Sequence, residues 1–203
     1  MMIADLYQLA SRPEIAWSGV GACAAGLLLA RKPATAVYIA LIPLINWSFA
    51  HVPTVPMPDG GVFQPLAIVT GLVLVARDFA QREVKTWVLA AMALGLVFSA
   101  LTTPLSIVLA SGAAFAISET ADWAVYTFTK RPFSQRVMLS SLVGAPVDTA
   151  VFLYGANFVT PGVLALSTAA TSIASKLLGA AVVAGMAATL ERRRADAGQQ
   201  NPA

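Results

Sequence analysis

Cysteine, histidine and charged residues are scarce in this 203-residue sequence. Cys23 is the single cysteine and His51 the single histidine, which excludes an internal disulfide and a metal site with two histidines. Only 11% of the residues are charged, whereas soluble domains carry about 25%. The Gly-x-Ser-x-Gly and His-Glu-x-x-His motifs are also missing. We therefore expect neither a soluble protein nor an enzyme, and no metal or other cofactor.

Apolar residues, in contrast, make up 58% of the chain, and the mean hydropathy is +0.74. A soluble protein of this length needs more polar cover than that for its surface. A transmembrane helix needs about 20 apolar residues. Candidate spans lie at residues 15–30, 35–50, 62–77, 86–103, 105–129, 137–154 and 162–190. The sequence predicts an all-α integral membrane protein, a multi-pass bundle of six to seven transmembrane helices, of which the first is the least clear.

Basic residues mark alternate connections between these spans, as cytoplasmic loops do. They follow the first, third, fifth and seventh spans: Arg31, Lys32, Arg77, Arg82, Lys85, Lys130, Arg131, Arg136, Arg192, Arg193 and Arg194. This alternation predicts that the N-terminus lies outside and the C-terminus in the cytoplasm. The net charge of +3 is spread over four edges, so we expect no nucleic-acid groove.

Four ionisable residues lie inside the predicted spans, where each costs about 2.5–3.5 kcal/mol to insert. Glu119 and Asp122, spaced i and i+3, share one face of the fifth span, and Asp148 and Lys176 follow in the sixth and seventh. Lys176 can neutralise one of the three acids. The other two must be protonated, hydrogen-bonded or paired with something outside the chain, which indicates a ligand or a transported proton. The alternative is a salt bridge that only fixes helix packing.

Other polar residues lie near the same level. Asn46 in the second span and Gln64 in the third offer paired donor and acceptor groups that suit the edge of a planar heterocycle. Asp78 is placed at the cytoplasmic end of the third span, where the alternative to a functional role is a solvated pair with Arg82.

Three stretches resemble the queuosine-precursor transporters, also called the vitamin-uptake transporter family. They are PLAIVTGLVLVARDFAQRE with Asp78, AISETADWAVYTFTKRP with Glu119 and Asp122, and SSLVGAPVDTAVF with Asp148 and Thr149. Lys176 in ASKLLGA and Asn46 also match family positions. The resemblance implies a six-helix transporter core at residues 35–190. Residues 1–34 would then hold an extra transmembrane helix, and 191–203 a cytoplasmic polar tail.

The resemblance further implies import of 7-cyano-7-deazaguanine or its aminomethyl relative across the cytoplasmic membrane. We expect Glu119 to accept the ring N–H and exocyclic amino group as a fork, and Asn46 or Gln64 to meet the ring oxygen. Asp122 or Asp148 would suit a cationic aminomethyl group. Asp148 and Lys176 would form a pair that breaks and reforms during transport, with Asp78 as a further gating residue and a proton as the coupling ion.

Other classes of function stay open at this point. The substrate-binding subunit of an energy-coupling-factor vitamin transporter also has about six helices; with no P-loop here, energising partner subunits would have to supply ATP hydrolysis. Transport of another small planar heterocycle is a further alternative. The expected partners are such a small molecule and the lipid bilayer, and the sequence leaves a homodimer open.

Overall fold

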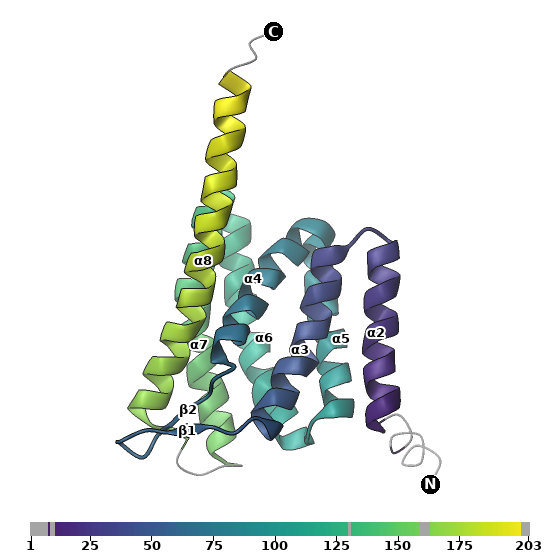
Figure 1. Ribbon diagram of the computed structural model, residues 1–203, viewed down its shortest axis with the longest axis vertical. Helices are drawn as coiled ribbons and strands as arrows, with labels where there is room; N and C mark the ends of the chain where they lie inside the picture. Colours follow the sequence, from purple (N-terminus) through teal and green to yellow (C-terminus); the bar gives the residue numbers. More distant parts are fainter. Residues whose placement is uncertain (1–7, 9–10, 130, 159–162, 200–203) are drawn as a thin grey trace.

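The computed structural model describes residue 8 and residues 11–129, 131–158 and 163–199. In this part of the chain, helices joined by short connections make up the fold (Figure 1). The helices are α2 (Pro13–Leu29), α3 (Pro33–His51), α4 (Ala67–Val84), α5 (Val88–Thr102), α6 (Leu105–Phe128), α7 (Phe133–Asn157) and α8 (Leu166–Gln199). A 3-10 turn, η1 (Lys85–Trp87), joins α4 to α5. The predicted all-α architecture is confirmed.

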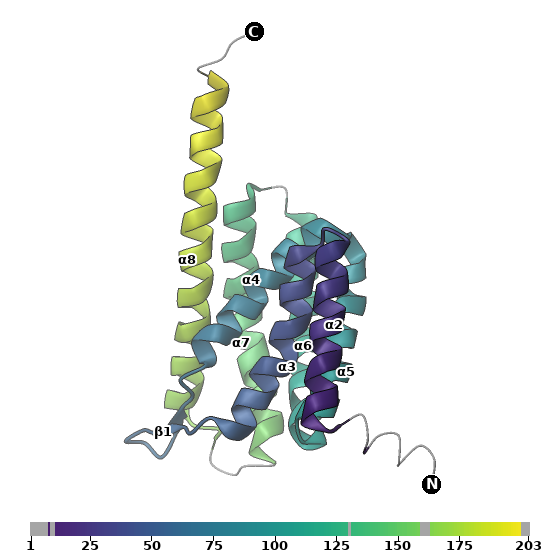
Figure 2. The ribbon, with the colours of Figure 1, turned by 45° about the vertical axis from the view of Figure 1, so that its right-hand side comes forward.

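The helices lie side by side and run alternately in opposite directions (Figure 1). Among the described residues, five helical stretches are long and apolar enough to cross a membrane, and one of them, Ala67–Thr102, contains α4, η1 and α5. The shorter apolar helix α2 has 17 residues and packs against α3 and α5 at the edge of the bundle (Figure 2). The total of seven crossings stays a prediction.

The connections rich in basic residues gather at one end of the bundle (Figure 1). They are the α2–α3 and α6–α7 connections, η1 and the C-terminal part of α8, and we name this the basic end. The opposite end carries the connection between α3 and α4, and we name it the hairpin end. The grouping agrees with the predicted alternation of charge, whereas the cytoplasmic location of the basic end stays a prediction.

Helix α4 begins and ends later than the sequence predicts. The expected span was 62–77 with a break at 78–85, but the helix covers Ala67–Val84. Arg77, Asp78 and Gln81 are buried within it. Because polar side chains that face partners inside a bundle do not have to end a helix, the break predicted at 78–85 is wrong.

The connection at the hairpin end contains two short antiparallel strands, β1 (Val55–Pro56) and β2 (Val62–Phe63). At its turn, Asp59 accepts hydrogen bonds from the backbone N–H of Ser167 at 3.2 Å and from its hydroxyl at 2.5 Å. The hydrogen bond from Ser167 is the main reason that the pKa of Asp59 is lowered, so the carboxylate is charged at neutral pH. The N–H of Val62 donates to Thr168 Oγ1 at 2.8 Å. The hairpin is thereby attached to the first turn of α8.

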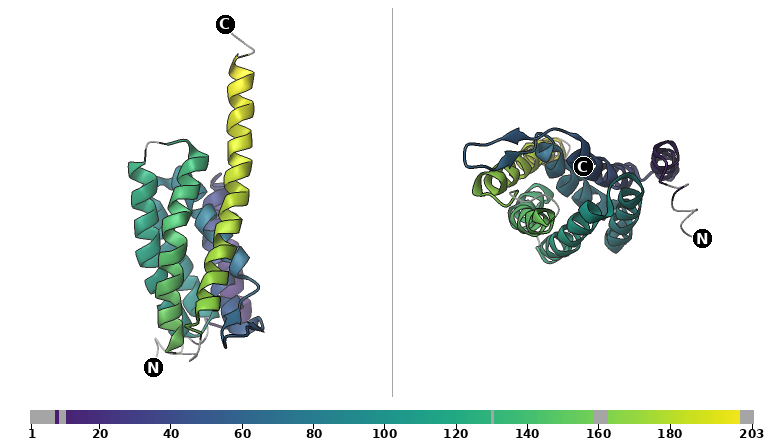
Figure 3. Two further views of the ribbon diagram at one scale, coloured as in Figure 1. Left: turned by 90° about the vertical axis from the view of Figure 1, so that its left-hand side faces the viewer. Right: turned by 90° about the horizontal axis from the view of Figure 1, so that it is seen from below.

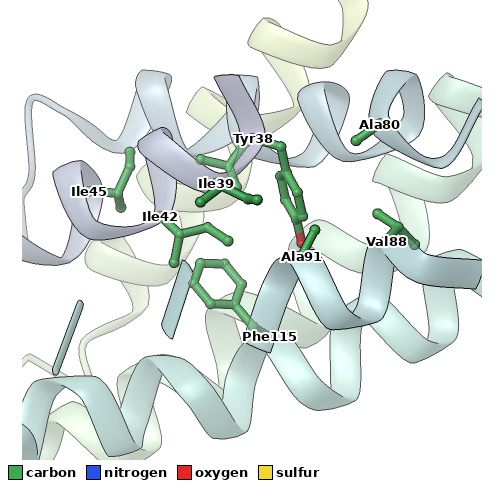
Figure 4. Packing of buried hydrophobic residues seen from close by; sticks show 9 residues of the cluster. Tyr38, Ile39, Ile42, Ile45, Ala80, Val88, Ala91 and Phe115 are labelled. Atoms are coloured by element: carbon green, nitrogen blue, oxygen red, sulfur yellow. The ribbon is translucent and has the colours of Figure 1, made fainter. Parts of the chain in front are cut away.

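Glycines allow two pairs of helices to pack closely in the core. A Cβ atom on Gly71 would lie 2.7 Å from the carbonyl oxygen of Lys176, and one on Gly95 would lie 2.6 Å from Ile42 Cδ1. Near the second contact, Tyr38, Ile42 and Phe115 belong to the main hydrophobic cluster (Figure 4). The first contact sets α4 directly against α8 and so places Lys176 beside α4.

Helix α8 is the longest element, with 34 residues, and its C-terminal part projects beyond the other helices at the basic end (Figure 3). It continues to Gln199, so residues 191–199 of the predicted polar tail are helical. The division into an N-terminal segment, a core at 35–190 and a tail stays a prediction.

The α4–α8 contact generates the first prediction. We expect Gly71→Ala to lower the thermal unfolding midpoint of the detergent-purified protein, because overpacking costs about 1–3 kcal/mol, more than the ~1 kcal/mol gained in helix propensity. Gly185→Ala in α8 is the matched control. Since nothing lies within 4 Å of its Cβ position, it should leave the midpoint unchanged or raise it. Equal effects of the two substitutions would contradict the close packing at Gly71.

Candidate functional site

Arg77, Asp78 and Glu119 form a fully buried group of charges, which we name the Arg77 cluster. Arg77 Nε lies 3.0 Å from Glu119 Oε2, and Arg77 Nη1 lies 3.0 Å from Asp78 Oδ1. Arg77 and Asp78 belong to α4, whereas Glu119 belongs to α6. One guanidinium thus faces two carboxylates and joins two helices.

Polar side chains surround the Arg77 cluster. Arg77 Nη1 donates to Gln81 Oε1 at 2.8 Å, and Ser140 Oγ of α7 donates to Asp78 Oδ2 at 3.1 Å. The hydroxyl of Tyr38, from α3, lies beside Glu119 and faces the interior of the bundle (Figure 4). Four helices therefore contribute to one polar layer inside an otherwise apolar bundle.

Asp148 and Lys176 form a second buried ion pair, which joins α7 to α8. Lys176 Nζ lies 2.5 Å from Asp148 Oδ2 and donates to Thr149 Oγ1 at 2.8 Å. The other carboxylate oxygen, Asp148 Oδ1, accepts from Ser118 Oγ at 3.4 Å. Because Ser118 precedes Glu119 in α6, the two buried groups of charges are neighbours.

A cavity of about 140 Å³ extends from the hairpin end to Lys176, and we name it the hairpin-end cavity. Its polar lining includes Gln64, Thr70 and Thr149. A smaller cavity of about 20 Å³ adjoins it and is lined by Asn46, Asp148, Phe115 and others. Both cavities share the following lining residues: Phe49, Thr70, Phe152 and Lys176. The Asp148–Lys176 pair therefore lies where the two cavities meet.

Three polar atoms from the cavity lining, Asn46 Oδ1, Gln64 Oε1 and Thr70 Oγ1, are buried and make no hydrogen bond with the described residues. The orientation of both amides follows from their other partners. Gln64 Nε2 donates to the carbonyl oxygen of Ser48, which can only accept. Asn46 Nδ2 donates to Ser99 Oγ, whose proton is already given to the carbonyl oxygen of Gly95. Both amide oxygens are thus available to a donor that enters the cavities.

Two aromatic rings line both cavities. The ring centroids of Phe49 and Phe152 are 4.7 Å apart, with an angle of 37° between the planes. Phe49 belongs to α3 and Phe152 to α7, so the two rings pack against each other across a helix boundary. Flat apolar faces next to unpartnered amide oxygens suit a small planar molecule with N–H groups on its edge.

The predicted site residues thus fall into two groups. Asp148, Lys176, Asn46 and Gln64 line the cavities, whereas Glu119 and Asp78 lie in the Arg77 cluster. The side chain of Asp122 lies outside the described residues. The interpretation of Asp78 as one half of a solvated pair with Arg82 is wrong, because Asp78 is 0% exposed.

The pattern of basic residues predicts Arg77 at a connection between spans and gives it no role in the site. Lys176 is the single cation expected among the buried acids, but Arg77 is 0% exposed and pairs with Glu119, which is one of them, and with Asp78. A signal was present: Thr70, Arg77 and Gln81 are spaced i, i+7 and i+11, which places them on one face of a helix. No comparable pattern marked Tyr38.

A family model described as "Putative vitamin uptake transporter" matches residues 60–189, which is more than half of the chain. The chain belongs to this family. The suspected vitamin-uptake transporter family is therefore confirmed, and with its apolar helices the chain is a multi-pass membrane protein with a transport role rather than an enzymatic one. A transporter of this family acts on a small molecule. Neither the curated proteins nor the solved structures contain a match.

The match places most of the site within the part shared with other vitamin-uptake transporters. It contains the Arg77 cluster, Asp148 and Lys176, and it begins just before β2. Asn46 and Tyr38 of α3 lie before the matched segment. The family model thus covers every buried charged residue described above.

The buried Asp148–Lys176 pair generates the second prediction. We expect Asp148→Asn to destabilise this vitamin-uptake transporter by about 3–5 kcal/mol, because Lys176 would keep its buried charge without a full counter-charge. Lys176→Met alone should destabilise to a similar degree. The double variant should recover part of the loss, which a double-mutant cycle of unfolding midpoints would measure. Strictly additive losses would contradict a direct pair.

Proposed function

We propose that this protein imports a queuosine precursor, 7-cyano-7-deazaguanine or its aminomethyl relative, across the cytoplasmic membrane. The family membership supports transport of a small molecule. The choice of the precursor rests on the resemblance of the stretches around Asp78, Glu119 and Asp148 to the queuosine-precursor transporters. In this proposal the hairpin end faces outward and the basic end faces the cytoplasm.

The observation that carries the proposal is the set of unpartnered polar atoms in cavities that two aromatic rings also line. A deazaguanine ring is planar and has N–H groups on its edge. Asn46 Oδ1 and Gln64 Oε1 are acceptors that lack donors, and Thr70 Oγ1 can donate to a ring oxygen. Phe49 and Phe152 offer faces for stacking. Such a ring thus brings the donors and the acceptor that the polar atoms of the cavity lining lack.

The unpartnered amide oxygens also change the roles that the sequence predicts for Asn46 and Gln64 in binding the ring. Asn46 and Gln64 were expected to donate to the ring oxygen, but each amide nitrogen already donates to the protein, to Ser99 Oγ and to the carbonyl oxygen of Ser48. We therefore propose that Asn46 and Gln64 accept N–H groups of the ring instead. A cationic aminomethyl group would be held by Asp148 in this arrangement.

The transport cycle that we propose uses the buried acids in sequence. Substrate would enter from the hairpin end, meet the Asp148–Lys176 pair and separate it. Glu119 would then accept the ring N–H and the amino group as a fork, with Asp78 as a further gating residue. A proton on one of these carboxylates would compensate the buried charge and serve as the coupling ion.

The third prediction tests this proposal by measuring the queuosine content of tRNA. In cells that can neither make nor import the precursor, we expect expression of this chain to restore queuosine at low precursor concentration. Asp148→Asn should abolish the effect, because Lys176 could no longer be neutralised on release of the substrate. Glu14→Gln, the same change of acid to amide at an exposed position of α2, is the control and should retain uptake.

Two outcomes of this experiment would favour one of the alternative functions. Absence of queuosine despite confirmed membrane insertion would exclude the precursor and leave another planar heterocycle. Restoration only when the ATPase subunits of an energy-coupling-factor transporter are present would favour the substrate-binding-subunit alternative. Uptake by the purified chain alone in liposomes would exclude that alternative, because the vesicles contain no partner subunit.

A further inference from the structure

Glu119 lies one helical turn beyond the end of the cavities. Phe115 lines the small cavity, and Glu119 follows it at i+4 on the same face of α6, about 6 Å further along the helix axis. Ser118, its neighbour, donates to Asp148 at the cavity wall. A substrate that moves from the cavities toward the basic end therefore meets Glu119 next. In the present state, Arg77 holds that carboxylate.

The guanidinium of Arg77 and the donor edge of the substrate ring offer a carboxylate similar hydrogen-bond donors. A guanidinium presents planar N–H donors in a fixed fork that matches a carboxylate. The N–H and adjacent amino group of a guanine-like ring present the same arrangement of donors. The ring edge is neutral, so it can replace the N–H donors of the guanidinium at the buried carboxylate but not its charge.

We propose that Arg77 is a positioning residue that occupies Glu119 in the empty transporter and is displaced by the donor edge of the substrate. The inference rests on the proposed function, because it takes the substrate to carry adjacent N–H donors. When Arg77 leaves Glu119, it keeps Asp78 and Gln81, both of which belong to its own helix α4. The exchange therefore breaks a contact between α4 and α6 and couples substrate arrival to separation of these helices.

This exchange also determines specificity. A ligand with a single N–H donor can satisfy only one of the two oxygen atoms of the Glu119 carboxylate. Arg77 would then stay on Glu119, and α4 and α6 would remain joined. A ligand with two adjacent donors satisfies the carboxylate and frees the guanidinium, so the amino group next to the ring N–H decides whether transport proceeds.

The binding test is the fourth prediction. It compares the precursor with its analogue lacking the exocyclic amino group, by dissociation constants on the purified full chain. We expect the wild type to favour the precursor about tenfold or more, because the analogue leaves part of the carboxylate unsatisfied. Arg77→Gln should tighten precursor binding several-fold, since the internal competitor is gone, while it slows transport. Glu119→Gln should reduce the preference to within about threefold.

Two further variants keep the test decisive. Arg77→Lys retains the charge without the planar fork, so it should bind the precursor more tightly than the wild type and keep the preference. Arg77→Gln with Glu119→Gln removes both charges and should lose the preference. Weaker precursor binding in Arg77→Gln, with the preference unchanged in Glu119→Gln, would overturn the proposed exchange.

A second measurement separates this inference from the choice of substrate. Methylguanidinium at millimolar concentration should raise the unfolding midpoint of Arg77→Ala by several degrees, because it takes the vacated place at Glu119. It should have no such effect on the wild type or on Arg77→Ala with Glu119→Gln. If the precursor fails to bind the wild type but methylguanidinium acts as expected, the proposed substrate is wrong and the exchange site stands. Equal effects on both Ala variants would overturn the exchange site.

Discussion

The cost of a charge in a low-dielectric interior is the constraint on which this structure depends. Asp78, Glu119 and Asp148 are buried among apolar helices, and such groups persist only when cations and hydrogen bonds compensate them. Arg77 and Lys176 provide that compensation, and both do so across helix boundaries. Because each ion pair joins two helices, the charges require α4 to lie near α6 and α7 to lie near α8. When these helices move relative to one another, each buried charged group must find a new partner.

The polar interior contains two groups of charges that meet near Ser118. The Arg77 cluster draws partners from four helices, and the Asp148–Lys176 pair borders cavities whose lining has amide oxygens without donors. The cluster also contains a buried acceptor without a hydrogen-bond donor among the described residues, Glu119 Oε1. Buried polar atoms are nearly always hydrogen-bonded, so each exception calls for an explanation. In both groups, a ligand that brings N–H donors would supply the missing partners.

Much of the fold could be predicted because long apolar runs determine where helices form. Helices α3, α5, α6 and α7 lie close to their expected spans, since each contains a long run of mostly apolar residues. The boundary of α4 could not be predicted in the same way, because Arg77 is polar in sequence yet buried in the fold. Asp148 and Lys176 were recognisable as buried charges. The partner of Glu119 depends on how α4 and α6 pack, which hydropathy does not reveal.

Helix α8 connects the site mechanically to a distant point. It is continuous from Leu166, beside the hairpin, through Lys176 to Gln199, well past the other helices at the basic end. At about 1.5 Å per residue its 34 residues measure about 51 Å, against a hydrocarbon thickness of about 30 Å. An uninterrupted helix of this length acts as a lever. A small tilt of α8 at the Asp148–Lys176 pair therefore moves its C-terminal end over a larger distance. A fluorophore attached to that end would report the state of the site from outside the membrane.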